Sequence, residues 1–106
     1  MIELRGYIDD KGNKRFASWL EALDSAAAAK VTIALTRIEQ GHYSKVKGVG
    51  AGVYEYKIDF GPGYRIYFGQ EGKRVILLLL GGDKTSQERD IVQAKKFLND
   101  YKRRRA

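Results

Sequence analysis

The side chains best suited to chemistry in this chain are basic, and they lie on two short alternating segments. Residues 53–60 (VYEYKIDF) and 64–68 (YRIYF) both alternate large apolar side chains with polar ones, the pattern of strands with one buried face. For the apolar positions of both strands to share a face, the connecting loop must hold an odd number of residues, about three or five. The opposite face then carries Glu55, Lys57, Arg65 and Tyr67. An arginine fork beside a lysine is suited to binding phosphate oxygens and to stabilising negative charge that develops on them.

Each of these side chains also has an ordinary structural explanation. Arg65 and Lys57 are both placed to form cross-strand ion pairs with Glu55 or Asp59, which contribute little at a surface. Tyr67 is suited to stacking on a nucleobase, although tyrosine at such a position is more often packed in the core. The alternation predicts which side chains share a face and leaves both roles open.

A glycine-rich segment precedes these strands. Residues 42–52 (HYSKVKGVGAG) contain several glycines and two lysines, Lys45 and Lys47. We expect a surface loop, because glycine weakens regular elements. Its lysines and backbone amides are suited to meet a phosphate, and the alternative is a flexible connector.

The first part of the chain predicts one strand and two helices. Residues 2–8 alternate as a strand does, and residues 14–23 and 26–40 place apolar side chains at helical spacing. The two helices are expected to form a hairpin that covers a sheet. The expected helix signals are Asn13 as the first N-cap, Asp24 or Ser25 as the second, and Gly41 as the terminator.

The last part of the chain predicts an interior strand and a terminal helix. Residues 75–80 are six consecutive apolar residues, as expected for a strand covered on both sides. Thr85 and Glu88 have capping-box spacing at the start of a helix over residues 86–101. Residues 102–106 form a basic tail that we expect to fray.

Composition indicates a single domain, residues 1–106, that carries an excess of positive charge. The chain has 20 Lys and Arg against 13 Asp and Glu, a net charge of +7. This balance favours a polyanionic partner, usually nucleic acid. A basic surface kept for solubility, or an acidic protein partner, would give the same charge.

Other features bound the location and the kind of site. The chain has no cysteine, which excludes disulfides and thiolate metal sites. Acidic side chains lack metal-ligand spacing, so neither a metal nor a cofactor is expected. The N-terminus, MIELRGYIDD, does not read as a secretory signal, and no apolar run approaches the roughly 20 residues that cross a bilayer. We therefore expect a cytoplasmic protein.

The order strand, two helices, three strands and a final helix resembles the RelE/ParE superfamily of toxin–antitoxin toxins. Two sequence segments are similar to the HigB-like addiction-module killer proteins: GVYEYKIDFGPGYRIYF and VILLLLGGDKTSQERDI. The resemblance covers nearly the whole chain and is densest over residues 52–94. It implies an α+β fold in which a small, mainly antiparallel sheet of about four strands packs against the N-terminal helical hairpin, with a C-terminal helix.

This resemblance implies the toxin of a type II module: a metal-independent endoribonuclease that cuts mRNA on the ribosome and inhibits translation. The implied partner is an antitoxin encoded beside it, typically a helix-turn-helix protein. The implied catalytic residues are Arg65, Lys57 and Lys84, and the implied basic residue before the glycine-rich segment is Lys47. Lys47 is expected to bind RNA, together with Lys45 of the glycine-rich segment and Tyr67 of the polar face.

The resemblance leaves one catalytic role open and two other functions possible. Some relatives carry a tyrosine or histidine in the terminal helix for proton transfer, but residues 87–91 contain neither, so the general acid is unassigned. The alternatives are a ParE-like gyrase poison that cuts no RNA, and a basic RNA- or partner-binding module without activity. The nuclease hypothesis requires Lys57, Arg65 and Lys84 to converge on one cationic hollow.

Overall fold

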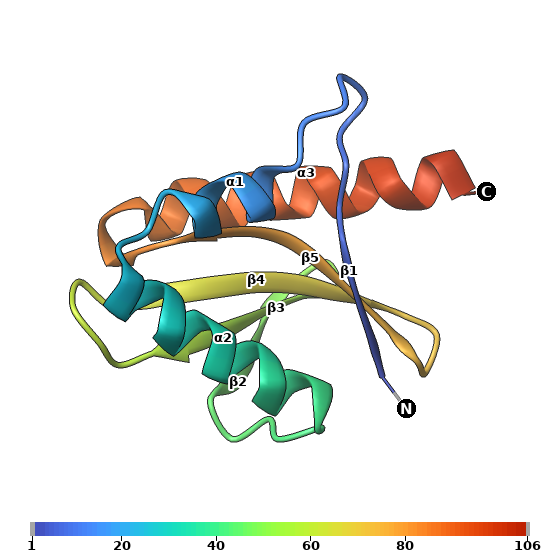
Figure 1. Cartoon of the computed structure of the whole chain (residues 1–106). Helices are drawn as coiled ribbons and strands as arrows, with labels where there is room; N and C mark the ends of the chain where they lie inside the picture. The colour runs from blue at the N-terminus through green and yellow to red at the C-terminus, as the bar shows by residue number, and fades with distance from the viewer. Residues whose placement is uncertain (1, 106) are drawn as a thin grey trace.

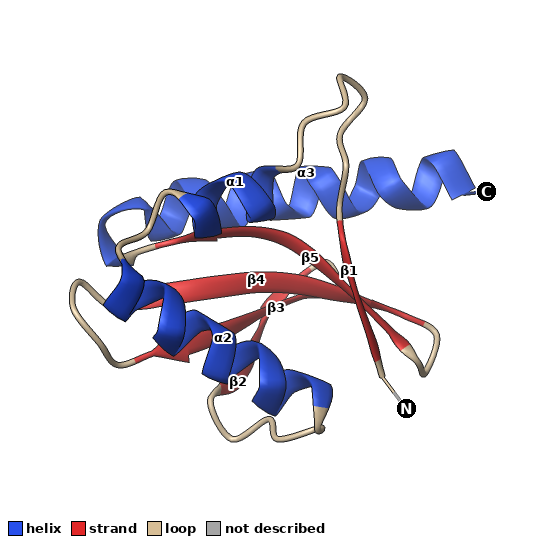
Figure 2. Ribbon diagram, in the orientation of Figure 1, coloured by secondary structure: helices blue, strands red, loops and turns tan. Residues whose placement is uncertain are grey.

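In a computed structural model, which describes residues 2–105, a five-stranded sheet carries helices on both faces (Figures 1 and 2). The strand order is β1-β5-β4-β3-β2, in which β1 and β5 are parallel and the other neighbours are antiparallel. This confirms the predicted α+β fold with its C-terminal helix, although the sheet has one strand more than expected. The elements are β1 (Glu3–Gly6), α1 (Arg15–Glu21), α2 (Ser25–Glu39), β2 (Val46–Gly50), β3 (Val53–Ile58), β4 (Tyr64–Glu71), β5 (Val75–Gly82), a 3-10 turn η1 (Lys84–Ser86) and α3 (Gln87–Arg105).

Two apolar cores lie on the two faces of the sheet. On one face, α1 and α2 pack against alternate residues of β3, β4 and β5, and on the other face α3 packs against the residues between them. β5 lies between β1 and β4, as its uninterrupted apolar run predicts. The helical spacing of apolar side chains predicted for residues 26–40 is confirmed, since the buried residues of α2 are Ala27, Val31, Ala34 and Ile38.

The hairpin of β3 and β4 has the predicted parity. The loop between Ile58 and Tyr64 holds five residues, and these two residues pair across the hairpin. Gly61 and Gly63 in the loop adopt positive φ values of 55° and 81°, which glycine accepts without a steric penalty. Lys57 therefore lies opposite Arg65 on the face away from α2.

The segment expected as a surface loop contains β2, so that expectation is wrong over residues 46–50. β2 pairs with β3 at the edge of the sheet, with an irregular register between Gly48 and Gly50. An edge strand needs a partner on one side only, so it tolerates glycines that would weaken a central strand. The turn that follows is unusual, because Gly50, Ala51 and Gly52 all have positive φ.

The N-terminal helix signals are confirmed for α2 and wrong for α1. The Asp24 carboxylate accepts a hydrogen bond of 2.8 Å from the backbone N–H of Ala27, as an N-cap does. Asn13 does not cap α1, because its backbone N–H and its side-chain amide both donate to Asp9. α1 instead begins after Lys14 without a side-chain cap.

The start and the end of the terminal helix both differ from expectation. The capping residue is Asp83, whose carboxylate accepts from the backbone N–H of Thr85, and Ser86 completes the capping box in place of Glu88. α3 continues through Arg105, so residues 102–105 are helical where a frayed tail was expected; residue 106 lies outside the described residues. Within residues 2–105, no helix has both the length and the apolar character needed to cross a membrane.

Two adjacent glycines at the end of β5 bring helices close to the sheet on both faces. A side chain at Gly81 would overlap the ring of Trp19 on α1, and one at Gly82 would overlap the carboxylate of Asp90 on α3. Gly82 pairs with Arg65 across β4 and β5. The glycine pair therefore sets how near the first turns of α3 lie to Arg65.

Candidate functional site

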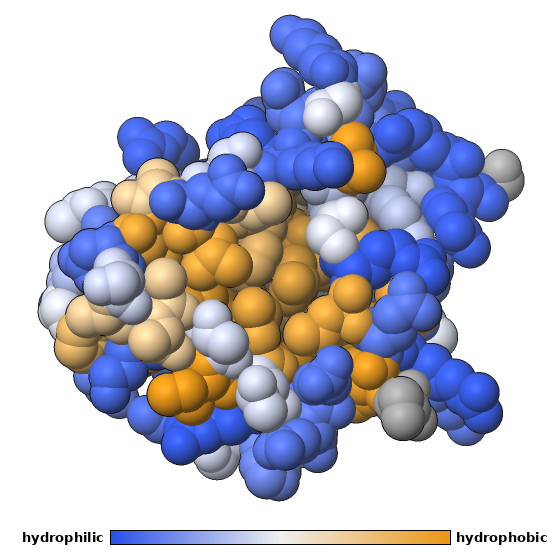
Figure 3. Space-filling view, in the orientation of Figure 1, coloured by the Kyte–Doolittle hydropathy of each residue, from blue (hydrophilic) through white to orange (hydrophobic). Residues whose placement is uncertain are grey.

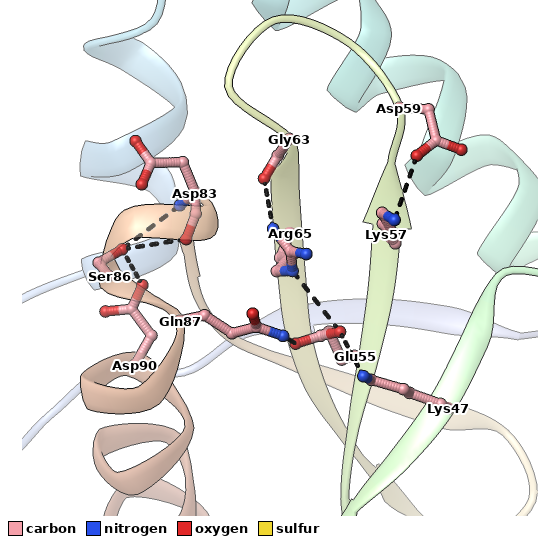
Figure 4. Close-up of polar contacts among 10 residues, drawn as sticks. All are labelled: Lys47, Glu55, Lys57, Asp59, Gly63, Arg65, Asp83, Ser86, Gln87 and Asp90. Carbon is pink, nitrogen blue, oxygen red and sulfur yellow. Dashed lines mark hydrogen bonds and ion pairs between the residues drawn. The ribbon is translucent and has the colours of Figure 1, made fainter.

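Three neighbouring strands, β2, β3 and β4, form a basic groove beside the start of α3 (Figure 4). Its volume is about 290 Å³. The strand register places Lys47 opposite Glu55 and Lys57 opposite Arg65. We call this the cationic groove; its lining residues are Ser44, Lys45, Val46, Lys47, Glu55, Lys57, Asp59 and Arg65.

Arg65 is the most buried cation of the cationic groove, with 6% of its surface exposed. Its Nη1 donates a hydrogen bond of 2.8 Å to the carbonyl of Gly63. Its Nε lies 3.7 Å from Oε1 of Glu55, too far for a hydrogen bond, and has no other partner among residues 2–105. A buried N–H without a partner costs about 1–3 kcal/mol. Nε of Arg65 is therefore an unsatisfied donor that is buried beneath the groove and faces Glu55.

Glu55 is a buried carboxylate that joins α3 to the strands of the groove. Only 1% of its surface is exposed. Its Oε1 lies 3.7 Å from Nζ of Lys47 as well as from Arg65, and its Oε2 accepts a hydrogen bond of 2.9 Å from Nε2 of Gln87 (Figure 4). Of the two acids proposed as ion-pair partners for Arg65, Glu55 is the one that lies beside it. This carboxylate holds Arg65 and Lys47 on either side of it.

The lysines of the groove are exposed and loosely paired. Lys57 and Lys45 lie 3.6 Å and 3.5 Å from the carboxylate of Asp59, and all three lysine side chains are between 43% and 66% exposed. Exposed ion pairs contribute at most about 1 kcal/mol, so a phosphate can replace these partners at small cost. Within the described residues no three metal-binding side chains gather. Four cations against two carboxylates leave the groove with a positive charge.

The predicted site residues do not all lie in the cationic groove. Lys57, Arg65, Lys47 and Lys45 line it together, as described. Lys84 is exposed at the start of η1 and does not line it. A Cβ built on Gly63 would lie 3.4 Å from Nη1 of Arg65 and 3.8 Å from Cβ of Lys84. The expected convergence on one hollow is therefore met by Lys57 and Arg65 and not by Lys84, whose Cβ lies beside the Gly63 turn outside the groove.

Tyr67 shares the face of Arg65, as its position in the strand predicts, but it is fully buried beneath α3. Burial raises the pKa of Tyr67, and the nearby Glu55 carboxylate raises it further. Its hydroxyl has no hydrogen-bond partner among residues 2–105. Because α3 covers the ring of Tyr67, the ring cannot stack on a nucleobase, and the stacking role expected for Tyr67 is not possible in this structure.

Two polar groups that the sequence did not reveal lie at the start of α3 and just before it. Gln87 reaches Glu55 from the helix, and Asp83 fixes where the helix begins. The side chain and backbone of Thr85 donate to Asp83 and hold the pKa of that carboxyl below its usual value. Helical spacing in the sequence indicates only that Gln87 precedes the apolar residues of α3. Its hydrogen-bond partner, Glu55, lies 32 residues earlier, so this contact becomes apparent only when α3 is packed on the sheet.

Comparison with known proteins gives two matches. The family model described as "Phage derived protein Gp49-like (DUF891)" matches residues 18–101, which include every residue that lines the cationic groove. The chain is also similar to an uncharacterized protein of Haemophilus influenzae, with 39% identity over 89 residues. That alignment covers 83% of this chain and 90% of the relative.

Proposed function

Because the chain belongs to the phage-derived Gp49-like family, we propose that it is the toxin of a type II toxin–antitoxin module, a role with which that family is compatible. We further propose that it acts as a metal-independent endoribonuclease on mRNA, in the manner of RelE and HigB-like toxins, and inhibits translation on the ribosome. The observation that carries this proposal is the cationic groove. It holds four cations against two carboxylates, and one of the cations, Arg65, is held in place by Gly63 and Glu55.

The proposed reaction is attack by a ribose 2′-oxygen on the adjacent phosphorus. The 2′-hydroxyl loses its proton, a bond forms between its oxygen and phosphorus, and the bond to the 5′-oxygen breaks. The products are a 2′,3′-cyclic phosphate and a 5′-hydroxyl that has taken up a proton. Negative charge grows on the non-bridging oxygens during this step, so fixed cations aimed at them lower the barrier.

Each cation of the groove receives a role from its position. Arg65, held between Gly63 and Glu55, stabilises the charge on the non-bridging oxygens. Lys57 lies opposite Arg65 in the register and is about half exposed, so it can move from Asp59 to the same phosphate and serve in positioning or proton transfer. Lys45 and Lys47 bind flanking phosphates, and Lys84 binds the strand where it passes the Gly63 turn.

A toxic cationic groove requires an antitoxin. We propose a partner encoded beside this chain, a helix-turn-helix protein with an acidic segment, because a basic surface attracts acidic partners and selects them by charge. The excess of seven positive charges on the chain favours the same kind of partner.

The proposal is tested by inducing the chain in bacterial cells and mapping new 5′ ends in their messages. The variants are Lys57→Ala and the double variant Arg65→Gln with Glu55→Gln, which removes both buried charges together and so avoids leaving one unpaired. Lys73→Ala, an exposed lysine outside the groove, is the control. Losing one donor to a developing oxyanion typically costs about 100-fold or more in rate.

We expect new RNA ends with the parent and with Lys73→Ala, and at least tenfold fewer with both groove variants at equal protein level and equal melting temperature. Intact messages together with broken DNA would instead indicate a gyrase poison. Intact messages and intact DNA would indicate a binding module without activity.

A further inference from the structure

A second groove lies on the other side of the edge strand β2, on the face of the sheet that carries α2. α2 leaves part of this face uncovered, and Figure 3 shows apolar side chains gathered in a hollow there, with hydrophilic side chains around it. The groove has a volume of about 280 Å³. We call it the aromatic groove; its lining residues are Tyr43, Val46, Lys47, Gly48, Tyr54, Phe68, Gln70 and Ile76.

Two tyrosines make the aromatic groove suitable for flat ligands. Tyr43 and Tyr54 are 42% and 37% exposed, among the most exposed large apolar residues of the described chain. The ring of Tyr54 stacks on buried Phe68, with 5.8 Å between centroids and 27° between planes. Gly48 lies opposite Tyr54 in the register, and even a methyl group there would approach to 3.8 Å of the ring. The ring of Tyr54 is therefore held in place while its surroundings stay open.

The aromatic groove and the cationic groove are continuous around one strand. Val46 and Lys47 line both of them. Lys47 and Glu55 point to the cationic side of β2 and β3, whereas Gly48 and Tyr54, the next pair in the register, point to the aromatic side. A chain with phosphates in the cationic groove therefore reaches the tyrosines by crossing the edge of the sheet.

The lining of the aromatic groove favours a base-bearing strand over a protein segment. Its only charged lining residue is Lys47, and no carboxylate lines it, so the charge suits an anionic ligand. Nucleobases stack on exposed aromatic rings regardless of sequence, and each such contact is worth about a tenfold change in affinity or more.

We propose that the aromatic groove is a nucleobase-stacking subsite for a single RNA strand whose phosphates occupy the cationic groove. This inference rests on the proposed function, because it assigns a binding site to a further part of the same RNA substrate. It also assigns base stacking to Tyr54 and Tyr43, which are exposed, in place of the buried Tyr67.

The test compares two probes that differ only in their bases: a fluorescently labelled RNA octamer, and a ribose-phosphate octamer of equal charge that lacks bases. Binding is measured by anisotropy at one salt concentration, because phosphate contacts make affinity depend on salt. The variants are Tyr54→Leu and Tyr43→Leu. Ile33→Ala, exposed to 49% on α2, is the control, and the melting temperature of each variant is recorded. Tyr43 lies in a loop, so Tyr43→Leu remains informative if Tyr54→Leu does not fold.

We expect the parent and Ile33→Ala to bind the RNA at least tenfold more tightly than the base-free strand. Each tyrosine variant should lower that preference about tenfold, the contribution of one stacked base, and bind the base-free strand as the parent does. An unchanged preference in both tyrosine variants would overturn the proposal and leave the groove to a protein partner. Lys47→Ala and Lys57→Ala that bind the base-free strand as tightly as the parent would show that its phosphates do not occupy the cationic groove. Failure of the proposed function gives a different result, because the parent then produces no new RNA ends in cells whatever its preference for bases.

Discussion

At the scale of single residues, the cationic groove is organised by a buried carboxylate that holds two cations. Glu55 lies between Lys47 and Arg65 at 3.7 Å from each, and Gln87 fixes its other oxygen. Burying a carboxylate is costly unless it is paired and hydrogen-bonded. Gln87 is therefore a positioning residue: it acts on the groove through Glu55.

The first prediction concerns Gln87→Ala. Removing the amide leaves Oε2 of Glu55 buried without its donor, and a hydrogen bond to a charged group contributes about 1.5–3 kcal/mol. We expect the free energy of unfolding, measured with urea, to fall by about 2 kcal/mol. Arg89→Ala, an exposed position two residues along α3, should change it by less than about 0.5 kcal/mol. Equal losses in the two variants would show that the bond to Glu55 does not stabilise the fold.

Alternation along the chain predicts which residues share the face of Arg65, because side-chain direction in a strand has a period of two. It does not predict their exposure. Glu55 and Tyr67 are buried because α3 covers that part of the face, and the position of α3 depends on its packing against β3, β4 and β5, which the alternation of single strands does not show. The same covering removes Tyr67 from the set of residues available for stacking.

At the scale of elements, strands and helices build the site, and glycines between them determine how closely the helices approach the sheet. Most elements follow from apolar periodicity, including the β3–β4 hairpin and α2. β2 is missed because a glycine-rich edge strand lacks strand propensity. The full length of α3 is missed because its last turn is held by groups distant in the sequence: Arg105 pairs with Glu71, and Arg104 donates to the carbonyl of Ile8. Arg104 also pairs with Asp100, four residues earlier on the same helix.

The second prediction concerns the glycine pair at the end of β5. Gly81→Ala places a methyl group against the ring of Trp19, and Gly82→Ala places one against the carboxylate of Asp90. Overpacking of this kind typically costs about 1–3 kcal/mol, so both variants should show lower midpoints of thermal and urea unfolding. Gly6→Ala is a matched control, because nothing lies within 4 Å of the added group. If Gly82→Ala proved as stable as Gly6→Ala, α3 would not be seated against β5 as described.

The third prediction concerns acid unfolding and the end of α3. The hydroxyl of Tyr7 donates to Asp100 at 2.5 Å, and this bond, with Arg104 and Arg103 nearby, lowers the pKa of Asp100. A lowered pKa in the folded state means that the ionised group stabilises the fold above its ordinary pKa near 3.8, and that this contribution is lost as the pH falls through the folded value. The difference in unfolding free energy between the parent and Asp100→Asn should therefore be largest near neutral pH and shrink below about pH 4.

Urea unfolding at a series of pH values from neutral to acid measures this difference. Glu21→Gln, an exposed position that forms no ion pair within residues 2–105, serves as the control. A difference between the parent and Asp100→Asn that stays constant across the pH range would contradict the role assigned to the charge of Asp100.

At the scale of the whole molecule, two grooves lie on opposite faces of one sheet and meet at its open edge strand. The cationic groove is continuous with the aromatic groove through Val46 and Lys47. A net charge of +7 surrounds both with a field that attracts polyanions. The arrangement suits a single RNA strand that passes around β2, with its scissile phosphate beside Arg65.

The most direct test of the central claim, that the cationic groove cleaves RNA through the 2′-oxygen, uses a translated message that carries one 2′-deoxynucleotide on the 5′ side of a mapped cut. The purified chain is added to ribosomes that translate either this message or the all-ribose message, and the cut ends are analysed. We predict that the all-ribose message yields 2′,3′-cyclic phosphate and 5′-hydroxyl ends, and that the substituted message stays intact at that position while it is still cut elsewhere. Equal cutting of both messages at the substituted position would contradict the account.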